Sequence, residues 1–279
     1  MTRLPPWIRV RLSQTPDLAD VTRLLQHHRL NTVCQSAQCP NRHECYGRGT
    51  ATFMILGDRC TRNCRFCAVT HDAPLPIDAD EPARVAAAAA AMRLQHVVVT
   101  SVTRDDCPDG GASVFSATIR ALREQLPRAS VEVLIPDFKG EPEPLDTVLA
   151  SGPDVLNHNL ETVRRLQAAI RPQADYACSL GVLRRAAAWR GDRRIRVKSG
   201  LMVGLGETDA EIEEAMADMR DAGVELLTIG QYLAPSRATY SCSSRVESPL
   251  AAREAPSSNF SQPSNLARWR RATSRAPRV

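Results

Sequence analysis

The stretch 55-ILGDRCTRNCRFCAVT-70 places three cysteines, Cys60, Cys64 and Cys67, directly after an apolar run. The spacing C-x3-C-x2-C brings three thiols within reach of one point and supplies no fourth cysteine nearby. Structural zinc sites usually close four ligands, which makes zinc the weaker interpretation. A 4Fe-4S cluster held by three thiolates keeps one iron open to a small molecule, and this explains the spacing best.

The cysteine stretch follows the first of six short apolar runs that alternate with helical patterns. Runs with so little polar alternation, separated by helices, indicate a parallel sheet whose outer face is covered by helices. The predicted fold class is α/β, a partial (β/α)6 TIM-like barrel, because an eight-stranded barrel would need two more units. The predicted strands lie at 52–56, 96–101, 131–135, 154–159, 194–204 and 224–233.

The predicted helices follow these strands. Thr208 and Glu211 form a capping-box pattern that starts the last one. The others are expected at 81–94, 113–126, 143–150, 161–170 and 175–189.

Three segments are expected along the chain. Residues 1–50 form an N-terminal extension that carries cysteines, and residues 51–235 form the barrel. Residues 236–279 form a tail rich in Ser, Arg and Pro with no sustained apolar period, which predicts disorder.

Composition excludes several classes of protein. The 36 Lys and Arg residues against 31 Asp and Glu are spread along the chain, so no polybasic tract predicts nucleic-acid binding. No apolar run is long enough to span a membrane, and the N-terminus MTRLPPWIRVRL lacks the apolar core of a signal peptide. We therefore expect a cytoplasmic protein, in which nine cysteines are better read as metal ligands or reactive thiols than as disulfides.

Polar side chains gather where the predicted strands end. Each one alone is consistent with a capping or solvated loop residue. Their common location at the carboxyl ends of parallel strands, where such folds place reactive groups, predicts a site there. The residues are Thr100, Ser101, Arg104, Asp105, Asp106, Asn157, His158, Lys198 and Ser199.

A second cysteine triplet, Cys34, Cys39 and Cys45, precedes the first with the spacing C-x4-C-x5-C. The spacing is wrong for a plant-type ferredoxin cluster, and three buried free thiols are rare in so polar a segment. It therefore predicts another three-thiolate site. The remaining cysteines, Cys107, Cys178 and Cys242, have no partners at ligand spacing and are expected to be ordinary thiols.

The first triplet resembles the signature of the radical S-adenosylmethionine (SAM) enzymes, in which the open iron chelates the methionine part of SAM. Phe66 matches the aromatic residue expected before the last cysteine, and GLMVGLGE at 200–207 resembles the strand that borders the adenine. Both triplets together, joined by GTATFMILGDRC, resemble the lipoyl synthase family. The similarity continues through TSVTRDDCPDGGA, VEVLIPDF, DVLNHNLETV, KSGLMVGLGET and LTIGQYLAPS, and covers roughly residues 4–236.

The resemblance implies two 4Fe-4S clusters and SAM as cofactors. Cys60, Cys64 and Cys67 would hold the SAM cluster, and Cys34, Cys39 and Cys45 an auxiliary cluster. In that family a deoxyadenosyl radical removes hydrogen from C6 and C8 of an octanoyl chain on a carrier-protein lysine, and the auxiliary cluster donates sulfur. The radical comes from the cofactor, so no catalytic side chain is expected.

The resemblance also implies partners and contacts. The partners are an octanoylated lipoyl-carrier protein, a reductant such as ferredoxin or flavodoxin, and an iron-sulfur carrier that repairs the auxiliary cluster. Lys198 and the run 104–106 are candidate contacts to SAM or substrate, with ordinary salt bridges as the alternative. The residues expected to bind the cofactor are Phe66, Thr100, Ser101, Asn157, Lys198, Gly200, Gly204 and Glu207.

The similarity stops abruptly after Ser236. The family's later Arg-Ser-Ser-aromatic motif, whose serine ligates the auxiliary cluster, has only Ser243-Ser244-Arg245 as a counterpart, in a different order. We therefore assign no fourth ligand to that cluster. Two other readings stay open, namely another radical SAM enzyme that inserts sulfur and a non-catalytic iron-sulfur binding module.

Overall fold

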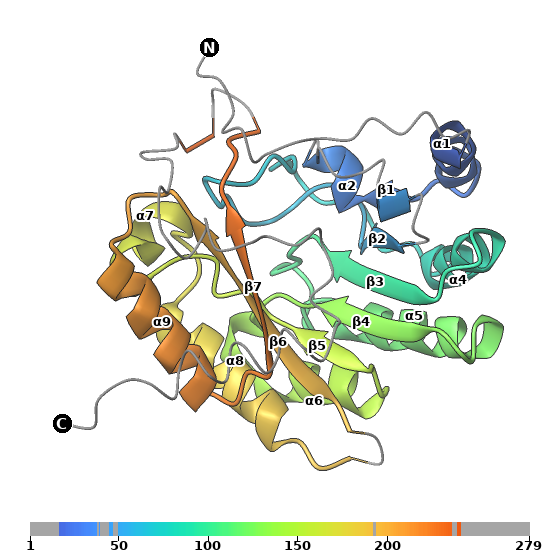
Figure 1. The fold of residues 1–279 in the computed structure, drawn as a ribbon. Helices are drawn as coiled ribbons and strands as arrows, with labels where there is room; N and C mark the ends of the chain where they lie inside the picture. The colour runs from blue at the N-terminus through green and yellow to red at the C-terminus, as the bar shows by residue number, and fades with distance from the viewer. Residues whose placement is uncertain are drawn as a thin grey trace.

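The computed structural model describes residues 17–37, 39, 45–46, 50–191, 194–235 and 239–240 of the 279-residue chain. Within these residues a seven-stranded sheet has its strands in chain order (Figure 1). Strand β1 is antiparallel to β2, whereas β2 to β7 are parallel to one another. The strands are β1 (Asn31–Thr32), β2 (Thr50–Ile55), β3 (His96–Ser101), β4 (Ser130–Leu134), β5 (Val155–Asn157), β6 (Arg196–Val203) and β7 (Leu226–Gln231).

Five long helices cover the outer face of the sheet, and the curved sheet encloses an inner face (Figure 1). Proline in the first turn of α4 and of α6 suits a helix start, because that turn has no use for the missing N–H. The predicted capping box of Thr208 and Glu211 begins α9 and is confirmed. These helices are α4 (Glu81–Ala91), α5 (Ala112–Gln125), α6 (Pro142–Ala150), α8 (Tyr176–Ala188) and α9 (Asp209–Asp221).

Alternation along each parallel strand separates the two faces of the sheet. Phe53, Val99 and Val133 point outward beneath the helices and are completely buried. The residues between them point inward, and the register aligns Thr52, Val98, Glu132, Val155 and Arg196 in one row across the barrel. The six parallel strands confirm the predicted partial barrel, and charged side chains lie on its inner face.

The helix predicted at 161–170 is wrong at its start, and only residues 164–170 are helical. Glu161 has φ of 68°, which a helix does not allow, and its backbone joins the edge of β6 instead. The Glu161 amide donates to Gly200 O at 3.0 Å, and the Met202 amide donates to Glu161 O at 2.9 Å. Only two short turns, η2 (Arg164–Leu166) and α7 (Gln167–Ile170), follow in this segment.

The N-terminal extension is attached to the barrel through β1. Helices α1 (Asp17–His27) and α2 (Val33–Ser36), which the sequence analysis does not predict, flank that strand. Residues 236–279, including Cys242, Ser243 and Ser244, lie outside the described residues except for Thr239 and Tyr240, so the predicted disorder and the domain boundaries stay predictions. None of the described helices is both long and apolar enough to cross a bilayer.

Candidate active site

The three cysteines of the first triplet lie on the loop that leaves β2 at the carboxyl edge of the sheet. Burial raises the pKa of Cys64 to about 11, although Arg171 opposes the rise, and the neighbouring Cys67 and Cys60 raise it further. Backbone amides point at two of the sulfurs, from Thr103 to Cys60 Sγ at 3.3 Å and from Val69 to Cys67 Sγ at 3.5 Å. Three thiols thus lie together, with amide donors that suit thiolates.

The three cysteines of the second triplet are described, but much of the segment between them is not. Cys34 lies on α2, and the Cys39 amide donates to Cys34 O at 3.1 Å. Burial raises the pKa of Cys34, as does the nearby Cys39. Cys45 is half-buried. Among the described residues no three His, Cys, Asp or Glu side chains converge tightly enough to hold a single metal ion, whereas a cluster spreads its ligands over several irons.

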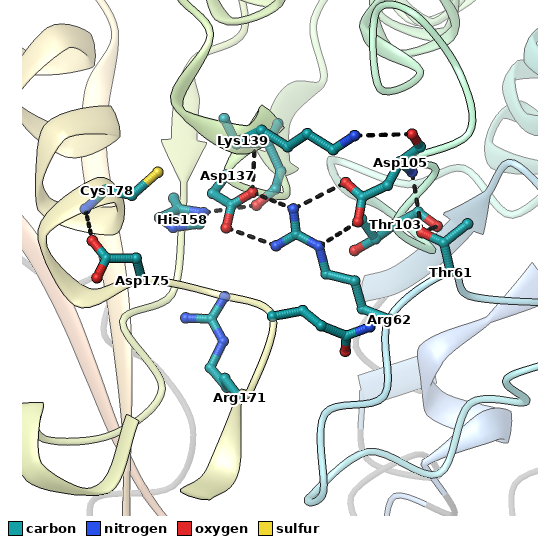
Figure 2. Close-up of polar contacts among 12 residues, drawn as sticks. Thr61, Arg62, Thr103, Asp105, Asp137, Lys139, His158, Arg171, Asp175 and Cys178 are labelled. Atoms are coloured by element: carbon teal, nitrogen blue, oxygen red, sulfur yellow. Dashed lines mark hydrogen bonds and ion pairs between the residues drawn. The ribbon is translucent and has the colours of Figure 1, made fainter. Parts of the chain in front are cut away.

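A buried arginine links the cysteine loop to the two neighbouring loops (Figure 2). Arg62 lies between Cys60 and Cys64 in the sequence, and its guanidinium donates to the carboxylate of Asp105 and to that of Asp137. Asp105 follows β3 and Asp137 follows β4. Burial alone would raise the pKa of Asp137, but Arg62 outweighs burial and holds that pKa below its usual range.

The polar residues predicted at the strand ends do gather at one edge of the barrel. We call the loops that follow β2 to β6 the barrel mouth. The Thr100 hydroxyl has a hydrogen-bond partner, because it donates to Leu134 O at 2.9 Å. Ser101 Oγ and Asn157 Oδ1 are buried and have no hydrogen-bond partner among the described residues. Arg104 pairs with the exposed carboxylate of Asp106 at 2.8 Å.

Lys198 occupies a different place from the one expected. Its ammonium contacts Glu132 Oε1 at 2.8 Å inside the barrel, and His96 approaches the other carboxylate oxygen at 3.4 Å. Burial alone would raise the pKa of Glu132, but His96 and Lys198 together hold it at about 2. We call His96, Glu132 and Lys198 the barrel floor. The predicted contact of Lys198 to SAM or substrate stays a prediction.

The predicted glycine strand is shaped by close approaches. A Cβ at Gly200 would lie 2.6 Å from Asn159 Oδ1, so any larger residue would displace the Asn159 side chain. Gly204 has φ of 98°, and its amide and that of Leu205 both donate to the Glu207 carboxylate. Glu207 therefore fixes the turn that follows β6. Phe66 is half-buried and packs against the core.

Two residues at the mouth, His158 and Arg171, are not among those expected to bind the cofactor, although His158 is expected at a strand end. His158 is 1% exposed, and its Nδ1 lies 3.0 Å from Ile135 O. Burial and the charge of Arg171 lower the pKa of His158 to about 4, so the ring is neutral at pH 7. Since a neutral ring whose Nδ1 donates to a carbonyl has a lone pair on Nε2, the unpartnered Nε2 is an acceptor.

Arg171 is the second of these residues. Its side chain donates to Asn159 O and Leu160 O at 3.3 Å, and its Nε has no partner in the part of the chain that the structure describes. Its charge lowers the pKa of the Cys64 thiol, against the larger effect of burial, so it lies beside the cysteine loop. No periodicity marks Arg171 in the sequence, and only its place between α7 and α8 distinguishes it.

Comparison with known proteins agrees with this fold and site. Residues 54–219, more than half of the chain, match the family model described as the Radical SAM superfamily. Methylornithine synthase shares the fold with a TM-score of 0.54 at 15% identity, over 86% of this chain and 71% of that chain. SuiB of Streptococcus suis bound to S-adenosylmethionine also has a TM-score of 0.54, at 10% identity over 79% of this chain and 46% of that chain. Fold and cysteine loop thus define a radical SAM protein.

Curated relatives narrow this class. The lipoyl synthase of Nitratidesulfovibrio vulgaris strain Hildenborough is 57% identical over 84% of this chain and 78% of its own length. That of Chlorobium phaeovibrioides is 53% identical over 84% of this chain and 82% of its own length. The chain belongs to the lipoyl synthase family. It is therefore an enzyme of the radical SAM type, with a 4Fe-4S cluster and SAM as cofactors.

Proposed function

We propose that this enzyme inserts two sulfur atoms, at C6 and C8, into an octanoyl chain that is amide-linked to a lysine of a carrier protein. The observation that carries the proposal is the pair of separate cysteine triplets, one on the barrel mouth and one on the extension attached through β1. One iron-sulfur site suffices to generate a radical from SAM. A second site explains where the inserted sulfur comes from.

The residues present fit the cofactors that this chemistry needs. Three soft thiols in one loop suit a 4Fe-4S cluster with an open iron. Around them, Asn157 Oδ1, His158 Nε2 and Arg171 Nε are buried polar atoms without partners among the residues that the structure describes. Buried polar atoms are normally satisfied, and a polar small molecule bound at the mouth supplies such partners. SAM, with its amine, carboxylate and ribose hydroxyls, has the matching groups.

Each protein group has a defined task in this proposal. Cys60, Cys64 and Cys67 would hold the first cluster, and the positive charge of Arg171 suits the SAM carboxylate. When bound, the cluster and SAM supply the radical that breaks unactivated C–H bonds, which no side-chain acid or base can do. The protein positions the octanoyl chain and excludes water from the inner face of the barrel.

Cys34, Cys39 and Cys45 would hold the auxiliary cluster that donates sulfur. Inserting sulfur consumes that cluster, so turnover requires an iron-sulfur carrier that rebuilds it. A ferredoxin or flavodoxin would deliver the electrons, and the octanoylated carrier protein would be the substrate. We assign no fourth protein ligand to this cluster.

The test is anaerobic reconstitution of the full chain, followed by assay of deoxyadenosine and of thiolated product with an octanoyl-lysine peptide. Wild type should make both, and Cys39→Ala should release deoxyadenosine but form no thiolated peptide. Cys107→Ala, which removes a half-buried thiol outside both triplets, serves as the control and should behave as wild type. Normal thiolation by Cys39→Ala would show that the early triplet does not donate sulfur. Iron uptake without deoxyadenosine from wild type would favour a non-catalytic module.

A further inference from the structure

The loop that carries the first triplet has no regular structure to fix its shape. Between Ile55 and Glu81, all of which the structure describes, the chain forms no helix and no strand apart from an isolated bridge between Arg59 and Thr70. Three thiols on such a loop keep their relative positions only if other parts of the protein hold the loop. The contacts that do so decide whether the loop is ordered before any metal arrives.

Arg62 makes the largest set of these contacts. Its Nε and Nη2 donate to Asp105 at 2.7 and 3.0 Å, and its Nη1 and Nη2 donate to Asp137 at 2.7 Å each. The side chains of Arg62 and Asp137 are only 5% and 3% exposed. One planar guanidinium therefore bridges two carboxylates from different loops, a geometry that the single ammonium of lysine cannot reproduce.

The backbone around Arg62 is tied to the same two loops. Thr61 donates from its amide and its hydroxyl to Thr103 O, at 3.1 and 3.0 Å, and its hydroxyl accepts from the Asp105 amide at 3.1 Å. Lys139 completes the junction, with its ammonium 3.0 Å from Asp105 O and its amide 2.9 Å from Asp137 (Figure 2). The loops after β2, β3 and β4 therefore meet at one arginine.

The junction is also balanced in charge. The carboxylates of Asp105 and Asp137 both pair with the Arg62 guanidinium, and the Lys139 ammonium adds a second positive charge nearby, on the Asp105 carbonyl oxygen. Without Arg62, two carboxylates would approach each other beside a loop that must carry thiolates. The same arginine thus orders the loop and neutralises its surroundings.

We propose that Arg62 is a positioning residue for the radical chemistry, which holds the Cys60–Cys67 loop in one arrangement on Asp105 and Asp137 before iron is bound. The proposal rests on the proposed function only for the nature of the group that the cysteines hold. Arg62 itself touches no reacting atom. Its role is to keep three thiols at the separations that one cluster requires.

The chain offers a matched control at the opposite end of the barrel. Arg123 is also largely buried, at 18% exposure, and it donates to Asp154 at 2.8 Å and to two carbonyl oxygens at 3.0 Å. It ties α5 to the segments that precede β4 and β5, far along the strands from the cysteine loop. Arg123→Lys therefore removes a comparable guanidinium fork without touching the barrel mouth.

The first measurement is amide hydrogen exchange on the metal-free full chain. In Arg62→Lys the amides of Cys60, Thr61 and Arg65 should exchange about tenfold faster or more, while the amides of α5 and α8 stay as in wild type. Arg123→Lys should leave the three loop amides unchanged. Equal exchange of these amides in the two variants would overturn the proposal, whatever the enzyme inserts into its substrate.

The second measurement links the loop to the cluster. In a background in which Cys34, Cys39 and Cys45 are all alanine, Arg62→Lys should take up less than about half the iron of its parent, and the paramagnetic resonance spectrum of the reduced cluster should broaden. Arg123→Lys in the same background should match the parent. Normal iron content and spectrum in a variant with a loosened loop would refute the positioning role.

A second variant covers the outcome in which Arg62→Lys does not fold. Arg62→Gln combined with Asp137→Asn removes the buried charge pair together, so no buried carboxylate is left without its partner. The same faster exchange and lower iron uptake are expected, and wild-type behaviour in both measurements would again overturn the proposal.

Discussion

The barrel mouth and the barrel floor are built from the same kinds of residues but treat them differently. At the floor, Lys198 and His96 both face the Glu132 carboxylate, so the buried charges compensate one another. At the mouth, Asn157, His158 and Arg171 each keep a buried polar atom that no group in the described part of the chain satisfies. Buried polar atoms are normally satisfied, so a protein that only needed stability would pair these three. The mouth is therefore the region whose polar atoms are free to meet a ligand at the cysteine loop.

Charge alone does not distinguish the two regions, because the mouth also contains a compensated cluster. Arg62, Asp105 and Asp137 are as well paired as Glu132 and Lys198. The difference is that the Arg62 cluster joins loops, whereas the floor joins strands that the sheet already holds. The mouth therefore has two kinds of polar residues. Arg62 and its two aspartates hold the loops in place, whereas Asn157, His158 and Arg171 face the space where a ligand would bind.

The variant expected to have the largest effect is Cys64→Ala at the mouth. It should abolish reductive cleavage of SAM, because two thiols do not hold the cluster, and it should keep about four iron atoms on the early triplet. The measurement is deoxyadenosine production together with iron content. The thermal midpoint of the metal-free chain should match wild type. Unchanged deoxyadenosine production would break the assignment of the mouth as the SAM site.

Arg171→Gln should have the next largest effect. Loss of one charge-assisted hydrogen bond to a carboxylate should raise the KM for SAM roughly 10- to 100-fold. The kcat for deoxyadenosine at saturating SAM should fall much less, because Arg171 is assigned to binding. Arg185→Gln is the control, since Arg185 lies on the exposed surface of α8 and pairs with Asp146 of α6. An unchanged KM for SAM would show that Arg171 does not contact the ligand at the mouth.

Glu132→Gln at the floor should leave the KM for SAM unchanged and alter stability instead. The carboxylate has its pKa at about 2 in the folded chain against 4.5 ordinarily, so its stabilisation is fully present above about pH 4.5 and is lost as the pH falls toward 2. At pH 7 the variant should lose on the order of 3 kcal/mol of unfolding free energy.

Urea unfolding of the metal-free chain at several pH values measures this difference. The gap between wild type and Glu132→Gln should narrow as the pH falls from 4.5 toward 3, because the wild type loses its own stabilisation there. A gap that does not change with pH would mean that packing, and not the charge of Glu132, stabilises the floor. A raised KM would mean that the floor contacts the ligand after all.

Much of the fold could be predicted because its signals are local. Six apolar runs, the helices between them and the capping box of Thr208 each depend on residues a few positions apart. The prediction fails at the start of the segment 161–170, because the helical pattern there competes with a tertiary contact, in which Glu161 pairs with the edge of β6. Local propensity does not report such a contact.

The site could be predicted less completely, for a related reason. Spacing reveals the cysteine triplets, since their ligands are close in sequence. The partner of Lys198 lies 66 residues away in the chain, and the two partners of Arg62 lie 43 and 75 residues away, so only the folded barrel brings them together. The order of parallel strands predicts which strand ends are neighbours, but it does not predict which carboxylate pairs with a given arginine.

One contact at the end of the described chain bears on how the enzyme is made. The Tyr240 amide donates to Arg65 O at 2.8 Å, and the Tyr232 hydroxyl donates to Tyr240 O at 2.9 Å. During translation the cysteine loop leaves the ribosome long before Tyr240 is synthesised. While the chain is still being synthesised, the loop therefore lacks this cover, and an iron donor acting on the nascent chain meets a more open loop than one acting on the finished enzyme.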